Sequence, residues 1–217
     1  MTSIEHKKTE ICLLCNSNAS TFYNYNDRHF FKCNTCAGIF LDKNLWLTKE
    51  DEIARYITHN NDVEDKNYQL FVSPITNAVL RDFDKEHYGI DFGAGTGPVI
   101  SKILGDHKFQ IVQYDPFFHN YKNLLDKKYD YIVCCEVIEH FYHPKKEFDL
   151  LKKIMRPNAK LYCMTVLFED NMDFHNWYYK NDPSHVFIYQ SKTIYWIKEN
   201  LKFSDVIINN RLITFSK

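Results

Sequence analysis

The segment "DFGAGTGPV", residues 91–99, places three glycines directly after the apolar run Tyr88–Phe92. Glycines at alternating positions let the backbone turn sharply and let a ligand approach the main chain closely. Pro98 suits the first position of a helix. The segment therefore predicts a strand, a tight turn and a helix in immediate succession, and such a turn at the carboxyl end of a strand is where open α/β sheets bind ligands.

Short apolar runs continue to alternate with helical patterns after this turn. They cover residues 109–114, 129–135, 160–167 and 205–208, and "RLITFS" closes the chain. This alternation predicts a doubly wound, mostly parallel α/β sheet covered on both faces. Asp115 ends the second of these strands, where an acidic residue can accept both hydroxyls of a ribose. The spacing DxGxGxG differs from the GxGxxG of dinucleotide enzymes, and no P-loop lysine follows it.

Two Cys-x-x-Cys pairs stand within the first forty residues, separated by a stretch with few aliphatic side chains. Paired knuckles at this spacing predict a tetrahedral zinc site, whose metal would supply the folding energy of a small module. A redox function is the main rival, but two pairs at this spacing argue against it. The predicted zinc ligands are Cys12, Cys15, Cys33 and Cys36.

Three parts are expected along the chain: a small zinc ribbon over residues 1–45, a helical linker or lid over 46–86, and a ligand-binding domain over 87–217. In the linker, "LTKEDEIARYITHN" predicts a helix with Thr48 as N-cap and Asp51 in the capping-box position. "EDKNYQLFVSPITNAVLRDF" has helical apolar spacing, with Pro74 tolerated near the first turn.

From residue 88 to about 216 the sequence resembles the class I S-adenosylmethionine-dependent methyltransferases. The resemblance lies in "IDFGAGTG", "QYDP", "YDYIVCCEVIEHF" and "LKKIMRPNAKLYCMT". It implies a Rossmann-like sheet, S-adenosylmethionine as cofactor, and a ribose held by the acid of "QYDP". With the cysteine pairs, the chain looks like a bacterial branch that carries a four-cysteine module before the catalytic domain. The residues implied to bind the cofactor are Asp91, Phe92, Gly93, Ala94, Gly95, Asp115, Pro116, Cys135 and Glu136.

One region departs from the family pattern. Only "PFFHNYKNLLDKKY" separates Asp115 from the next strand, which is too short for the usual helix, third strand and helix. The third-strand region is therefore expected to be abbreviated, and with it the loop that supplies an acidic contact to the adenine in this family. Phe117 is the candidate to stack on the base.

"EVIEHF", residues 136–141, places two carboxylates and an imidazole at the exit of a buried strand. If the chain turns helical after Glu136, then Glu136, Glu139 and His140 share one face. Methyl transfer to a neutral hydroxyl, amine or carbon also requires proton removal, which calls for a base or a Lewis acid. We therefore take these three residues, together with His185, as the candidate catalytic set.

The same segment resembles the ExxEH of ubiquinone-type O-methyltransferases and of small-RNA 3′-terminal 2′-O-methyltransferases. In the latter, the two glutamates, the histidine and a later histidine hold a divalent ion, and His185 in "NDPSHVFIY" is the candidate for the later one. Such a set suits manganese, cobalt, iron or zinc better than magnesium. Three interpretations stay open: a metal-free base at His140, a second divalent metal at Glu136, Glu139, His140 and His185, or a structural role.

Charge and hydropathy argue against two kinds of partner, nucleic acid and the membrane. The formal net charge of −1 lacks the positive excess of a nucleic-acid binder. No apolar stretch reaches membrane-spanning length, and "MTSIEHKKTE" does not resemble a signal peptide, so a cytoplasmic protein with reduced thiols is expected.

The aromatic segment "FEDNMDFHNWYYKNDPSH" follows the strand predicted at residues 160–167. It is expected to cover an acceptor pocket, as a stacking wall or as a packed lid.

These observations predict methyl transfer from S-adenosylmethionine to an oxygen, nitrogen or carbon of a small-molecule acceptor, beside a structural zinc. Two alternatives stay open. One is an RNA methyltransferase whose ribbon recruits the nucleic acid, although the ribbon's balanced charges argue against it. The other is a non-catalytic cofactor-binding partner that docks through the ribbon.

Overall fold

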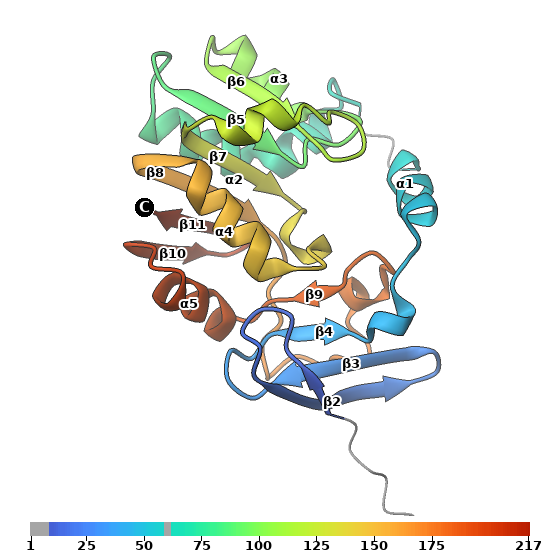
Figure 1. Cartoon of the computed structure of the whole chain (residues 1–217). Coiled ribbons are helices and arrows are strands. Elements are labelled where there is room, and N and C mark those ends of the chain that lie inside the picture. The colour runs from blue at the N-terminus through green and yellow to red at the C-terminus, as the bar shows by residue number, and fades with distance from the viewer. Residues whose placement is uncertain (1–8, 59–61) are drawn as a thin grey trace, which may run out of the picture.

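The computed structural model describes residues 9–58 and 62–217. These residues form a six-stranded mixed sheet with helices on both faces and a five-stranded antiparallel sheet below it (Figure 1). No helix in these two ranges is both long enough and apolar enough to cross a membrane.

The larger sheet has the strand order β10-β11-β8-β7-β5-β6. Its four adjacent parallel strands carry the apolar runs of the sequence, which are buried on both faces of the sheet. β11 runs antiparallel to β8 and to β10, so the sheet is mixed, and β11 alone runs against the other five strands. The strands are β5 (Tyr88–Phe92), β6 (Gln110–Tyr114), β7 (Tyr129–Cys135), β8 (Met155–Met164), β10 (Asp205–Asn209) and β11 (Leu212–Ser216).

Helices cover both faces of this sheet (Figure 1). On one face α2 (Lys66–Asp82) and α3 (Val99–Asp106) pack on Tyr131 and Tyr162. On the other face α4 (Pro144–Ile154) and α5 (Ser191–Asn200) pack on the alternate residues of the same strands. α3 begins immediately after Pro98, as the glycine segment predicts.

α2 corrects one expectation. Pro74 lies in the middle of this 17-residue helix and not near its first turn. A proline there removes one backbone donor and leaves the carbonyl of Leu70 without its helical partner. Leu70 is 72% exposed, so water can satisfy that carbonyl. Burial of Val72, Ile75 and Val79 on the opposite face keeps the helix continuous.

The third-strand region is abbreviated, as predicted. The described residues 116–128 contribute no strand to the large sheet, and contain instead a turn closed by the Asp115–His119 bridge and a 3-10 turn at Lys122–Asp126. β6 is consequently the outer strand of the sheet.

The N-terminal region forms an antiparallel sheet of order β1-β2-β3-β4-β9. Four of its strands come from the cysteine-rich segment, but β9 comes from the other end of the chain, where it follows the catalytic candidate His185. The strands are β1 (Thr9–Ile11), β2 (Asn18–Tyr25), β3 (Arg28–Cys33), β4 (Ile39–Leu41) and β9 (Phe187–Ile188).

α1 (Lys49–Ile57) follows the cysteine-rich strands and begins at its predicted cap. The side chain of Thr48 accepts a hydrogen bond from the backbone N–H of Asp51, and its own hydroxyl donates to the Asp51 carboxylate. The last two residues of the predicted helix, 59 and 60, lie outside the described residues.

Candidate active site

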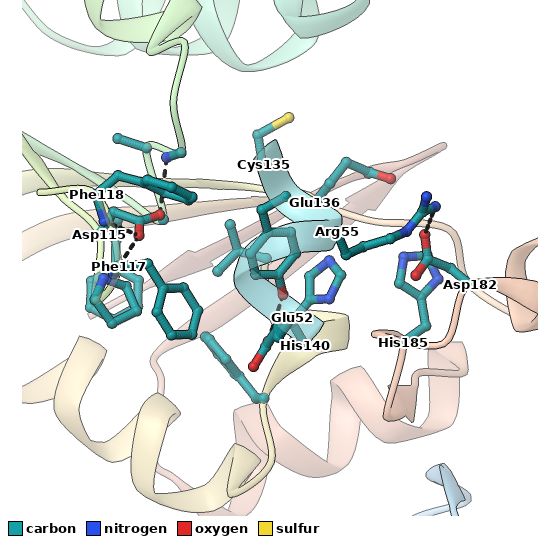
Figure 2. Close-up of a pocket in the computed structure, with 18 of the residues that line it drawn as sticks. Glu52, Arg55, Asp115, Phe117, Phe118, Cys135, Glu136, His140, Asp182 and His185 are labelled. Carbon is teal, nitrogen blue, oxygen red and sulfur yellow. Dashed lines mark hydrogen bonds and ion pairs between the residues drawn. The ribbon is translucent and has the colours of Figure 1, made fainter. Parts of the chain in front are cut away.

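A cavity of about 930 Å³ opens beyond the carboxyl ends of β5, β6 and β7. The glycine turn and Asp115 line one end, and His140 and His185 line the other (Figure 2). α1, α2 and the segment between β8 and α5 complete the wall. Sites that hold a small molecule commonly have this size.

The glycine turn is shaped for a ligand at Gly95. Gly93 and Gly95 both have the left-handed backbone that favours glycine, with φ of 82° and 62°. A Cβ added at Gly93 would lie 2.4 Å from the Val137 side chain, whereas one added at Gly95 would meet no atom within 4 Å. Glycine at 93 therefore serves packing, and glycine at 95 borders open space in the cavity wall.

Asp115 is held in a fixed orientation at the cavity wall. One carboxylate oxygen accepts hydrogen bonds from the N–H groups of Phe117 (2.8 Å) and Phe118 (3.1 Å), and the other accepts one from Gly95 (3.0 Å) (Figure 2). The second oxygen keeps a free lone pair for a ligand hydroxyl. This arrangement fits the predicted ribose contact.

The cofactor-binding residues implied by the sequence all line the cavity except Asp91. Asp91 is buried below the turn, where it accepts a hydrogen bond from the Ser101 hydroxyl at 2.9 Å. Burial raises the pKa of Asp91 to about 6. Its hydrogen bond to Ser101 connects the end of β5 to α3.

"EVIEHF" does not form the expected continuous helical face. Glu136 has a left-handed backbone (φ 51°), and the helical turn that follows is a short 3-10 turn at Ile138–His140. The Glu136 carboxylate accepts a hydrogen bond from Arg211 at 2.8 Å, across the sheet. Burial, reinforced by the charge of Glu139, raises the pKa of Glu136 to about 8. The Glu136 carboxylate is thus held by Arg211, on the β10–β11 turn.

Glu139 lies fully buried beneath the cavity. The Tyr179 hydroxyl donates to one of its oxygens, and the other oxygen has no hydrogen-bond partner among the described residues. Burial raises the pKa of Glu139 to about 7. A buried carboxylate oxygen without a hydrogen-bond partner costs free energy. We therefore expect this oxygen of Glu139 either to be protonated or to contact a bound ligand.

His140 and His185 lie side by side, with ring centroids 4.9 Å apart. His140 Nδ1 is 2.9 Å from the Ser184 carbonyl, and His185 Nδ1 is 2.8 Å from the Tyr179 carbonyl. A carbonyl only accepts, so each Nδ1 carries the proton and each Nε2 is left with its lone pair. Burial lowers the pKa of both rings, that of His185 to about 4, and keeps them neutral at pH 7.

The structure brings three of the four candidate catalytic residues together. One potential ligand atom from each of Glu139, His140 and His185 lies within 4.8 Å of the others. Glu136 stands outside this group, connected to it by a 3.3 Å contact from the Tyr179 hydroxyl.

α1 supplies cavity residues that the sequence did not indicate. Glu52 is 6% exposed and accepts hydrogen bonds from the hydroxyls of Tyr56 (2.7 Å) and Tyr142 (3.3 Å). Arg55 pairs with Asp182 at 2.6 Å (Figure 2). A polar residue on the apolar face of an amphipathic helix is a possible signal, but nothing local shows which distant segment it meets.

The Arg55–Asp182 pair is connected to His140 through Ser184. Asp182 also accepts hydrogen bonds from the backbone N–H (3.0 Å) and hydroxyl (2.6 Å) of Ser184. The carbonyl of Ser184 in turn accepts the proton of His140 Nδ1. α1 therefore holds the turn that orients His140.

The four cysteines of the N-terminal sheet also converge. Their sulfur atoms all lie within 4.8 Å of one another, with Cys12–Cys36 at 3.5 Å and Cys15–Cys33 at 3.3 Å, and the thiols are free. Four sulfurs around a zinc ion at about 2.3 Å are separated by about 3.8 Å. The cluster therefore fits a tetrahedral metal site in donor type, number and spacing.

Residues 65–206 match the sequence model of a family described as "Methyltransferase domain". The chain belongs to this family. The glycine turn and the Asp115 carboxylate that border its cavity are in keeping with a methyltransferase domain that uses S-adenosylmethionine. A search of proteins with curated functions finds no match.

Several solved methyltransferases share the fold. A phosphoethanolamine N-methyltransferase 2 from Haemonchus contortus with bound S-adenosylmethionine aligns with a TM-score of 0.52 at 15% identity, over 75% of this chain and 43% of that one. An O-methyltransferase family protein from Burkholderia thailandensis gives 0.50 at 10%, over 68% and 56%. The 1,6-didemethyltoxoflavin-N1-methyltransferase of B. thailandensis gives 0.51 at 12%, over 91% and 98%. The chain thus spans about half the length of the first two.

Proposed function

We propose that this methyltransferase transfers the methyl group of S-adenosylmethionine to an oxygen, nitrogen or carbon atom of a small-molecule acceptor. One observation carries the proposal. The same cavity is lined by Asp115, a carboxylate placed to accept a ribose hydroxyl, and by two neutral imidazoles, His140 and His185. The cofactor supplies an electrophilic methyl group, and the protein's task is to align the acceptor with it and to remove a proton.

At the cofactor end, the open space beside Gly95 gives the ligand access to the main chain. Asp115 would accept a ribose hydroxyl through its free lone pair, and Phe117 would stack on the base. Cys135 and Glu136, at the end of β7, would border the sulfonium end. These assignments follow the family resemblance, and the positions of the side chains in the cavity support them.

At the acceptor end, His140 would act as the general base. Its Nε2 lone pair is free, the Ser184 carbonyl fixes the tautomer, and burial keeps the ring neutral at pH 7. Glu139 and His185 flank it, and Tyr179 connects Glu139 to Glu136. This interpretation needs no second metal.

One observation favours a second candidate, a divalent ion held by Glu139, His140 and His185. Glu139 has an unpartnered carboxylate oxygen, and both rings donate Nδ1–H to backbone carbonyls, as metal-bound histidines commonly do. One carboxylate and two imidazoles suit manganese, iron, cobalt or zinc rather than magnesium. Such an ion would lower the pKa of an acceptor hydroxyl and hold it in place.

A small acceptor is favoured over RNA by the cavity and by the charge. The cavity is a bounded space lined by aromatic and acidic residues, and the chain has a net charge of −1. Two of the proteins with a similar fold are named for methylation of phosphoethanolamine and of 1,6-didemethyltoxoflavin, both small molecules. An RNA substrate would require a positive surface.

We further propose a structural zinc at the four cysteines. In this proposal residues 1–45 are the zinc ribbon, residues 46–86 the helical linker or lid, and residues 87–217 the catalytic domain. A cytoplasmic location would keep the four thiols reduced and able to bind the metal.

Calorimetry with S-adenosylhomocysteine tests the cofactor assignment. Asp115→Ala removes a charged acceptor and should weaken binding by about one to two decades. Asp126→Ala, a change of an exposed acid outside the cavity, should bind like the wild type. If the wild type prefers nicotinamide dinucleotides, or if Asp115→Ala binds normally, the assignment is wrong. Transfer of labelled methyl groups to a metabolite extract, with total RNA in parallel, then tests the acceptor class.

A further inference from the structure

The acceptor side of the cavity depends on a segment with little regular structure. We define the acceptor wall as residues 168–188, between β8 and α5. It contains a 3-10 turn at Tyr178–Asn181 and the two-residue strand β9. It also carries Tyr179, Asp182 and His185 into the cavity wall. A segment with so few internal backbone hydrogen bonds takes its shape from the elements on which it packs.

The N-terminal sheet fixes the backbone of the acceptor wall. β9 pairs with β4 in the register Ile39–Ile188 and Phe40–Phe187, and the N–H of Leu41 donates to the carbonyl of Val186 at 3.0 Å. Val186 directly follows His185. Because a one-residue slip would turn every side chain to the other face, this pairing determines the direction in which the wall leaves the sheet.

Side chains fix the rest of the wall against the same sheet. The Phe174 ring packs edge-on against Phe22 (4.9 Å between centroids), Tyr23 (5.1 Å) and Phe30 (5.3 Å). At the far end of the wall, Arg28 Nη2 donates to the backbone carbonyl of Asn181 at 2.6 Å. Phe168, Phe174 and Trp177 thus pack against the N-terminal sheet, whereas Tyr178 and Tyr179 line the cavity.

The cysteine cluster holds the turn that leads into β4. Cys33 ends β3, Cys36 lies in the following turn, and the N–H of Cys33 donates to the carbonyl of Gly38 at 2.9 Å. Gly38 in turn lies against β9, because a Cβ at this position would be 2.4 Å from the ring of Phe187. A continuous path of contacts therefore joins the four thiols to the residues that follow His185.

We propose that the N-terminal sheet, which carries the four cysteines, is a positioning scaffold for the acceptor wall. A metal ion at the four thiols would hold Tyr179 and His185 in place. The role of the wall rests on the proposed function. The cofactor end of the cavity is built on β5 and β6 of the other sheet. Loss of the metal should therefore loosen the acceptor end while cofactor binding persists.

Hydrogen exchange of the full chain, with zinc and after its removal by a strong chelator, measures this directly. Removal should speed exchange in peptides covering residues 179–188 by roughly tenfold or more, because local opening becomes easier. Peptides covering 88–106 should be unchanged, and the affinity for S-adenosylhomocysteine should change less than about twofold.

A second arm leaves every cysteine and every cavity residue intact. Gly38→Ala forces a side chain into the Phe187 ring, and Gly105→Ala is its matched control, because a Cβ there meets no atom within 4 Å. We expect Gly38→Ala to retain zinc and S-adenosylhomocysteine binding, yet to exchange faster at 179–188 and to transfer methyl more slowly. Gly105→Ala should do neither.

Unchanged exchange at 179–188 after metal removal, or equal behaviour of the two glycine variants, overturns the scaffold role. Simultaneous loss of S-adenosylhomocysteine binding overturns it too, because the effect would then be global unfolding. If the intact, zinc-loaded protein does not bind S-adenosylhomocysteine, the proposed function fails instead, and the exchange result still decides the scaffold role on its own.

Discussion

His140 receives its orientation from main-chain atoms rather than from a carboxylate. The Ser184 carbonyl accepts the Nδ1 proton, so the second nitrogen faces the cavity as a neutral base. One oxygen of Glu139, the preceding residue, accepts a hydrogen bond from the Tyr179 hydroxyl, and its other oxygen has no partner among the described residues. A ring that is neutral, fixed in one tautomer and in the wall of the cavity that Asp115 also lines is well suited to take a proton.

The corresponding prediction at the residue scale is that His140→Ala lowers turnover by about two to four decades, as loss of a general base typically does. Affinity for S-adenosylhomocysteine should stay close to that of the wild type. His107→Ala, a change of an exposed histidine outside the cavity, is the control. Full activity in His140→Ala would show that the motif is structural, and activity abolished by chelation but restored by manganese would show that the residue is a metal ligand.

At the scale of elements, α1 acts on the site through one ion pair. Arg55 holds Asp182, whose other oxygen holds the turn that carries the Ser184 carbonyl. Arg55→Met should lower the turnover number roughly tenfold, because His140 loses part of its orientation, at a cost of about 1–2 kcal/mol. The affinity for S-adenosylhomocysteine should be retained.

Steady-state kinetics at saturating cofactor, with NMR assignment of the His140 tautomer, provide the measurement. Arg55→Lys keeps a charge at this position and should recover part of the rate, and Glu50→Gln, an exposed change on the same helix, is the control. A normal rate and a normal tautomer in Arg55→Met would mean that the turn is held without α1.

A second tie between elements joins the end of α2 to β8. Asp82 accepts hydrogen bonds from Lys160 (2.9 Å) and the Tyr162 hydroxyl (2.7 Å), as well as from its neighbour Arg81 (2.7 Å). Burial alone would raise the pKa of Asp82, but these three donors outweigh it and hold the pKa well below its usual range. The folded state therefore favours the charged carboxylate.

Asp82→Asn should lower the free energy of unfolding at pH 7 by about 1.5–3 kcal/mol, the value of hydrogen bonds to a charged group. Because the folded pKa is depressed, this stabilisation is complete above the unfolded pKa near 4 and is lost as the pH falls below it. Urea denaturation at pH 7 and pH 3.5 should show the gap between wild type and variant narrowing. Asp205→Asn, at an exposed strand end, should show no gap. A gap independent of pH would rule out the charge as its source.

At the scale of the whole molecule, sequence patterns predicted what is local. The strands Tyr88–Phe92 and Tyr129–Cys135, the start of α3 and the cap of α1 follow from apolar runs, glycines and one threonine. The convergence of the cysteine pairs follows from spacing. Such features depend on neighbours within a few residues, so a short stretch of sequence is enough to predict them.

Features that depend on distant partners were not predictable. The pairing of β9 with β4 rests on two residues, too few for any periodic signal. Glu52 and Arg211 enter the cavity because of how α1 and the β10–β11 turn dock, and no local pattern specifies that docking. The prediction that Glu136, Glu139 and His140 share one helical face was wrong. The left-handed backbone at Glu136 redirects the chain before the short helical turn at Ile138–His140 begins.

The metal content of the whole chain is the remaining prediction. Elemental analysis of protein purified under reducing conditions should find one zinc per chain after dialysis against a mild chelator, since four clustered thiolates hold zinc tightly. Cys36→Ser should lose it, and Cys163→Ala, a buried cysteine of β8, should keep it. Absence of zinc from the wild type would contradict the assignment. A second ion that survives dialysis would support the site at Glu139, His140 and His185.

The shared sheet also has a consequence for how such proteins can be recombined. Four strands of the N-terminal sheet come from one end of the chain and the fifth from the other, so the cysteine-rich region is not a cassette that can be moved between enzymes unchanged. A graft onto another methyltransferase would also have to transplant residues 186–188 and the aromatic contacts of Phe174. Any lineage that exchanged one part without the other would lose the fit between them, so the two parts are expected to be inherited together.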